Sequence, residues 1–110
     1  MVSRIAAVLA AVLALAWVVQ EVQRTDGDRP ACQNLDAAVV LSEAAGQQGG
    51  RAYYGNLRRL VSEGTCSVLE KGAAVEVVAD SSVGRLGRFV LVRPAGQKGS
   101  GLWMPAGWLE

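Results

Sequence analysis

The chain has 110 residues and a mass of 11.5 kDa, which is enough for one small domain and excludes a large multidomain enzyme. Eleven basic residues against ten acidic ones leave a net charge of +1. No stretch carries the basic surplus of a nucleic-acid-binding surface, so nucleic acid is not expected as a partner. The chain also lacks histidine, the commonest general base and metal ligand at neutral pH, which argues against most enzymes and against a metal site.

The first element is an apolar run over residues 5–19, preceded by Arg4. As a helix this run is about 22 Å long, short of the roughly 30 Å hydrocarbon core of a bilayer. Two interpretations stay open. The small residues around Ala16 fit signal-peptidase cleavage after that residue, whereas retention as an anchor accounts better for Trp17, which would lie at the level of the lipid headgroups. Residues 1–19 are therefore predicted to be a signal peptide or a membrane anchor.

The charge of Arg4 predicts that the N-terminus stays inside and that residues 20–110 face the periplasm, either anchored through 5–19 or exported. Cys32 and Cys66 agree with an oxidising compartment. They are too far apart for a CxxC redox motif and lack the further thiols or histidines of a metal site. We expect a disulfide, which closes a loop of about 35 residues and stabilises the fold by about 4 kcal/mol in the chain-entropy model. Two unpaired buried thiols are the alternative.

A polar stretch follows over residues 20–31, with an Asp-Gly-Asp sequence, a proline and no apolar period. This composition predicts a linker. Asn34 is the predicted N-cap of a helix that runs to Ala45. The glycines within 46–50 are expected to end that helix in a loop.

A clearer helical period covers residues 51–63, and Gly64 follows it as a residue suited to the left-handed conformation that ends helices. The two helices predict a helical hairpin over residues 32–65. Since Cys32 precedes this hairpin and Cys66 follows it, the disulfide would join its two ends.

The apolar period changes to that of strands from residue 67 onward. Four or five short strands do not form a stable flat sheet, so a small closed or half-closed barrel is predicted. The expected strands are 67–69, 73–79, 88–93 and 102–104. They are separated by turns at 71–72 and 80–87 and by a glycine-rich hairpin loop at 94–101, and 105–107 forms a short helical turn.

The closing stretch Trp103-Met-Pro-Ala-Gly-Trp108-Leu109, with the apolar strands before it, resembles a bacterial SH3-like domain of the SH3b type. In that family a strand that ends in an aromatic residue and proline leads into one turn of 3₁₀-helix, and a final short strand closes the barrel. The resemblance covers residues 66–110 and implies an SH3-like β-barrel there. The aromatic-rich, acidic loops of eukaryotic peptide-binding grooves are missing, so the resemblance extends only to wall-targeting modules of bacterial envelopes.

Two tryptophans and a tyrosine are candidate binding residues. Trp103 and Trp108 flank a proline and offer rings on which a sugar or peptide can stack, although rings that fill the small barrel are the favoured interpretation. Tyr54 lies about 100° around its helix from Tyr53. Because Tyr53 belongs to the packed stripe, Tyr54 is free to contact the barrel or a partner.

Arg85 and Arg88 complete the candidate binding residues and give the barrel a cationic bias. Nearby carboxylates almost balance them, which favours a solvated face over an anion site. Without histidine, a nucleophile would need an activating lysine or carboxylate, and Lys71 and Lys98 both lie in predicted turns, where lysines are solvated. We therefore expect no catalytic residues, no metal and no cofactor.

These features predict an α+β chain. It has an N-terminal hydrophobic helix, a linker, a disulfide-linked helical hairpin over 32–65 and a small SH3-like β-barrel over 66–110. The expected function is that of a non-catalytic envelope protein, for example a small accessory subunit of a membrane complex, which binds a partner protein through its extracytoplasmic SH3-like domain. A peptidoglycan-binding module is the alternative, and a small hydrolase is a weaker third class.

Overall fold

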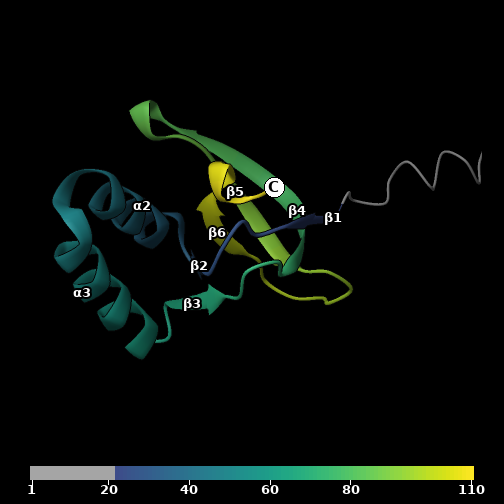
Figure 1. The fold of residues 1–110 in the computed structure, drawn as a ribbon. Helices are drawn as coiled ribbons and strands as arrows, with labels where there is room; N and C mark the ends of the chain where they lie inside the picture. The colour runs from purple at the N-terminus through teal and green to yellow at the C-terminus, as the bar shows by residue number, and fades with distance from the viewer. Residues whose placement is uncertain (1–21) are drawn as a thin grey trace, which may run out of the picture.

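The structure is a computed structural model that describes residues 22–110. Its strands form one six-stranded antiparallel sheet in the spatial order β1-β4-β5-β6-β2-β3, which curls into a half-barrel (Figure 1). The strands are β1 (Val22–Arg24), β2 (Arg29–Cys32), β3 (Cys66–Leu69), β4 (Ala74–Val83), β5 (Gly87–Pro94) and β6 (Leu102–Pro105). The two α-helices are α2 (Leu35–Glu43) and α3 (Gly49–Ser62).

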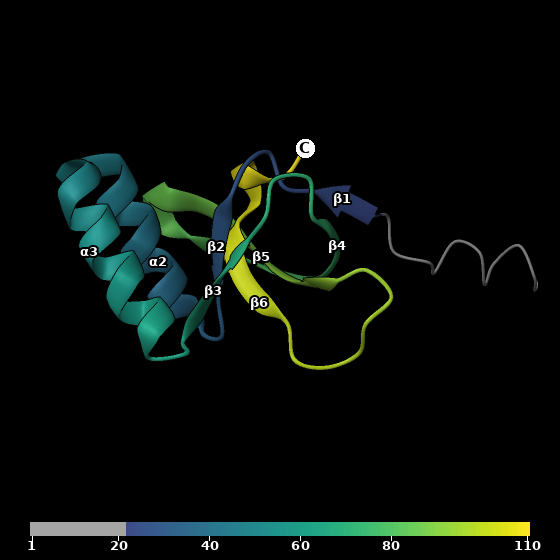
Figure 2. The same cartoon turned by 60° about the horizontal axis from the view of Figure 1, so that its bottom comes forward.

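The sheet has an apolar core on each of its two faces. Neighbouring residues of a strand point to opposite sides, and in β5 and β6 both neighbours are apolar. Phe89 and Trp103 pack toward the helices, whereas Val90 and Met104 pack inside the curl. Figure 2 shows α2 between α3 and the sheet. The buried residues on the helix side are Cys32, Ala37, Ala38, Leu41, Leu60, Cys66 and Phe89, and those inside the curl are Ala31, Val75, Val90, Val92 and Met104.

The predicted ends of the helical region are confirmed by their hydrogen bonds. Asn34 has an extended backbone, and the N–H of Ala37 donates to its side-chain oxygen at 2.8 Å, as expected of an N-cap. Beyond α3, Gly64 adopts a φ of +77°, and the N–H groups of Gly64 and Thr65 donate to carbonyls of the last helical turn. This pair of bonds is a Schellman motif, which explains why the helix ends there.

The predicted loop between the two helices is wrong. A π-helical turn, Ala44–Gln48, follows α2 directly, and α3 begins at Gly49, so no loop separates the two helices. Gly46 and Gly50 keep φ angles outside the left-handed region. Glycine in a helix costs only about 1 kcal/mol relative to alanine, so packing of the two helices is able to override the turn preference of these glycines.

The predicted fold class, a helical hairpin followed by a separate barrel, is also wrong, because strands from both sides of the helices form one sheet. The expected linker contributes β1 and β2 to the sheet, and β2 lies between β6 and β3. Residues 66–110 therefore do not form a barrel by themselves. The helices are an insertion between two neighbouring strands, not a helical hairpin that precedes a barrel.

The expected N-terminal hydrophobic helix, within residues 1–19, lies outside the described residues. Within 22–110, no helix has the length and apolar character needed to cross a membrane.

Two prolines limit the contact between β2 and β6. The register pairs Cys32 with Trp103 and no further residues. Two residues beyond that pair, the same register would place Pro30 opposite Pro105, and neither proline has an N–H to donate. The missing donors explain why the pairing does not extend that far.

Candidate functional site

The predicted disulfide is confirmed. Cys32 and Cys66 are directly opposite each other on β2 and β3, with Cα atoms 4.0 Å apart, and both are buried. Cys32 comes shortly before α2, and Cys66 comes shortly after α3. The covalent bond therefore lies at the base of the helical insertion and fixes it to two strands of the sheet.

Trp108, one of the candidate binding residues, is in contact with a cation. The guanidinium carbon of Arg29 lies 4.9 Å from the centroid of the Trp108 ring, within the range of a cation–π interaction. Nε and Nη2 of Arg29 donate to the two carboxylate oxygens of Asp26 at 2.7 and 3.2 Å. These hydrogen bonds hold the pKa of Asp26 below its ordinary value. Arg29 is thus fixed between a carboxylate and an aromatic face.

Tyr53 and Tyr54 form a second pair of side chains, on α3. Their ring centroids are 5.2 Å apart at an interplanar angle of 72°, an edge-to-face arrangement. Tyr53 is half-buried, and burial raises its pKa while the charge of Arg29 lowers it. Tyr54 is 62% exposed. We call Trp108, Arg29, Tyr53 and Tyr54 the aromatic row.

The ring of Tyr54 also lies close to the helix backbone. A Cβ atom built at Gly50, four residues earlier, would be 4.0 Å from Cε2 of Tyr54. Side chains four residues apart are neighbours on a helix surface. The ring therefore lies near the backbone of the first turn of α3 and beside Tyr53, although most of its surface is open to solvent.

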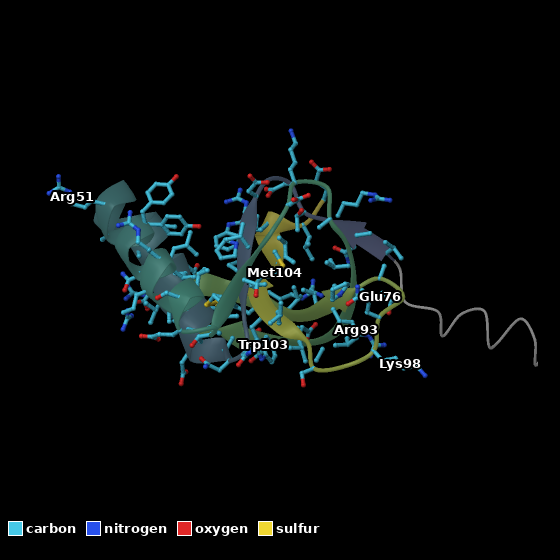
Figure 3. The ribbon with its side chains drawn as sticks, turned by 90° about the horizontal axis from the view of Figure 1, so that it is seen from below. Arg51, Glu76, Arg93, Lys98, Trp103 and Met104 are labelled. Carbon is cyan, nitrogen blue, oxygen red and sulfur yellow. A yellow bond between two sulfur atoms is a disulfide. The ribbon has the colours of Figure 1, made fainter. Side chains whose placement is uncertain are left out.

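Trp103, the second candidate tryptophan, has a different environment. It is half-buried and packs against the cluster beneath the helices, and Figure 3 shows it on β6 next to Met104. Core packing and ligand contact were the two alternatives for this ring, and its packing against the helix-side cluster places it with the core rather than in the aromatic row.

Arg85 and Arg88 belong to the β4–β5 hairpin and are not part of the aromatic row. Nε of Arg88 lies 3.2 Å from a carboxylate oxygen of Asp80, and both side chains are exposed. Arg85 is in the 3₁₀ turn Gly84–Leu86 and lines a hollow of about 190 Å³ together with Glu43. In the described part of the chain, neither arginine lies over an aromatic ring.

Arg29 is the member of the site that the sequence did not reveal. It lies in the stretch predicted as a linker, where its spacing of three residues from Asp26 was the available signal. Among residues 22–110, no three His, Cys, Asp or Glu side chains are grouped so that they could hold a metal ion. Aromatic faces, a paired guanidinium and a phenol hydroxyl suit non-covalent recognition of another molecule.

Comparisons of this chain with family models, curated proteins and solved structures found no match. Its function is therefore inferred from the chemistry of its own residues.

Proposed function

We propose that this chain is a non-catalytic envelope protein that binds a partner protein through the aromatic row. The observation that carries the proposal is the ring of Tyr54, which is 62% exposed and yet packs edge-to-face with Tyr53. A large ring that is already positioned loses little conformational entropy on binding. Such a ring is therefore an effective anchor for a protein interface.

The composition of the row supports a protein partner. Tyrosine, tryptophan and arginine are the residues enriched at binding hot spots. Arg29 and Trp108 contribute a cation stacked on an aromatic face, and the two hydrogen bonds to Asp26 restrict the guanidinium. A partner would thus meet a surface whose side chains are largely ordered before it arrives.

The proposed location is the periplasmic side of the cytoplasmic membrane. The disulfide between Cys32 and Cys66 supports it, because such bonds persist in oxidising compartments and are rare in the cytosol. The apolar run over residues 5–19 supplies a signal peptide or an anchor for export. Alkylation tests this location: when the protein from intact cells is denatured with the alkylating agent present and without reductant, neither Cys32 nor Cys66 should react, although unfolding exposes both.

The binding function is tested by photocrosslinking in intact cells. The full chain is made with p-benzoylphenylalanine in place of Tyr54, and a second version carries it in place of Lys98, an exposed loop residue. We expect a light-dependent adduct with one protein at position 54 and none at position 98. Adducts that contain muropeptides would support wall binding instead, and no specific adduct at position 54 would refute the proposal.

A further inference from the structure

We infer that the partner docks on the outer face of α3 with an acidic protein segment, an inference that rests on the proposed function. The helix Gly49–Ser62 contains three arginines and no acidic residue. All three arginines, Arg51, Arg58 and Arg59, are exposed. A chain with a net charge of only +1 therefore concentrates positive charge on one helix, around the exposed Tyr54.

The spacing places two of these arginines on either side of Tyr54. Arg51 precedes it by three residues and Arg58 follows it by four, so all three residues lie within an arc of about 60° on the helix surface. Gly55 leaves the adjoining surface uncovered, since a Cβ atom there would meet nothing within 4 Å. The outer face thus has an aromatic centre with a cation toward each end.

The charges of these arginines are available to a partner. Among residues 22–110, the ion pairs are formed by Arg29, Arg88 and Arg93, all outside α3. Within the helix, Nη2 of Arg59 donates to the side-chain oxygen of Asn56 at 3.2 Å, a neutral acceptor. The positive charge on α3 therefore remains unneutralised by carboxylates of the described chain.

The position of α3 favours a protein over an anionic lipid surface. Figures 1 and 2 show the helices at one end of the molecule and β1 at the other. Because β1 follows the apolar run of residues 5–19 in the sequence, an anchor formed by that run would join the folded part at the end away from α3. Figure 3 shows Arg51 extending from this distal end, on the opposite side from Lys98.

The geometry defines the chemistry of the partner segment. Arg51 and Arg58 are seven residues apart, which is about 10 Å along a helix at 1.5 Å per residue. Two carboxylates about 10 Å apart would pair with them, and guanidinium groups bind carboxylates in a bidentate geometry. An apolar side chain between the carboxylates would pack on Tyr54. Such a segment has acidic residues about seven positions apart in a helix, or four apart in a strand, where every second side chain points to the same side.

The experiment starts from the adduct formed at position 54 and identifies the partner peptide by mass spectrometry. That peptide is synthesised and titrated against the full chain at several salt concentrations. We expect a peptide with acidic residues flanking the crosslink, an affinity that falls as salt rises, and at least about tenfold weaker binding to the Arg58→Glu variant. Replacing the facing acidic residue of the peptide by lysine should restore binding to that variant.

Lys98→Glu is the matched control, because it changes the net charge equally at an exposed site away from α3. It should bind as the native chain does, and circular dichroism should show both variants folded. A crosslinked peptide without acidic residues, or equal weakening by the two substitutions, would overturn this inference and leave partner binding intact. An adduct with anionic lipid alone would overturn both proposals.

Discussion

Arg29 on β2 lies over the ring of Trp108, with 4.9 Å between the guanidinium carbon and the ring centroid. A backbone hydrogen bond joins the same parts of the chain: the N–H of Asp26 donates to the carbonyl of Trp108 at 2.9 Å. An isolated bridge between Thr25 and Leu109 lies beside them. These contacts connect the N-terminal strands to the end of the chain, where the half-barrel would otherwise be open.

The ion pair between Asp26 and Arg29 predicts sensitivity to acid. The folded state lowers the pKa of Asp26 below its ordinary value of 3.8. The ion pair therefore contributes to the free energy of unfolding above pH 3.8, and this contribution is lost as the pH falls through the pKa of the folded state. We expect Asp26→Asn to be less stable than the native chain at neutral pH and to lose less stability on acidification. Urea unfolding at a series of pH values measures both effects. Glu63→Gln, an exposed carboxylate substitution, is the control, and identical acid dependence of the Asp26 variant and the native chain would contradict the prediction.

Thr25 is the buried polar side chain that fixes the turn between β3 and β4. Its hydroxyl donates to the carbonyl of Glu70 at 2.7 Å and accepts from the N–H of Ala73 at 3.1 Å. Thr25→Val keeps the shape of the side chain but removes its hydroxyl, so the carbonyl of Glu70 and the N–H of Ala73 lose this hydrogen-bond partner. We expect a loss of about 1–3 kcal/mol in the free energy of unfolding. Denaturant unfolding measures it. Thr65→Val, whose hydroxyl makes no hydrogen bond within the described chain, should lose less.

Gly101, where the hairpin loop enters β6, has no room for a side chain. A Cβ atom at this residue would lie 2.7 Å from Cγ of Leu91 and 2.9 Å from the carbonyl oxygen of Val92. Because the backbone oxygen has little freedom to move, we expect Gly101→Ala to destabilise the fold by about 1–3 kcal/mol. At Gly107 an added Cβ meets nothing within 4 Å, so Gly107→Ala should be close to neutral. Thermal unfolding of both variants makes the comparison, and equal melting temperatures would contradict it.

Loss of the disulfide should destabilise the whole domain. Replacing Cys32 and Cys66 together by alanine is expected to cost about 2–5 kcal/mol, as for other small disulfide-bonded domains. Reductant should lower the melting temperature of the native chain and leave that of the double variant unchanged. A native chain that is insensitive to reductant, with its thiols shown to be free, would exclude this role of the bond.

Features set by local chemistry were predictable from the sequence. The side chain of Asn34 and the backbone freedom of Gly64 fix the two ends of the helical region through hydrogen bonds to residues nearby in the chain. The strands around Val68, Val90 and Trp103 also agree with their apolar patterns. In each case the deciding contacts are short-range or lie along one strand.

Features set by distant partners were not predictable. Val22 pairs with Glu76, more than fifty residues later, so the short polar strand β1 has no signal of its own. The predicted turn at 80–87 is shorter than expected, because β4 continues until Val83 pairs with Gly87. The aromatic row has the same origin: Tyr54 and Trp108 were candidates separately, and only the fold brings Arg29 onto the ring of Trp108.

The covalent bond at the base of the helical insertion also has a mechanical consequence. A partner that pulls on α3 loads the chain toward Cys32 in one direction and toward Cys66 in the other. Extension under that force ends at the bond between the two sulfur atoms, so at most residues 33–65 are drawn out. Beyond the bond, the force passes from Cys32 into β2 and β1, and the helical insertion cannot be extended further.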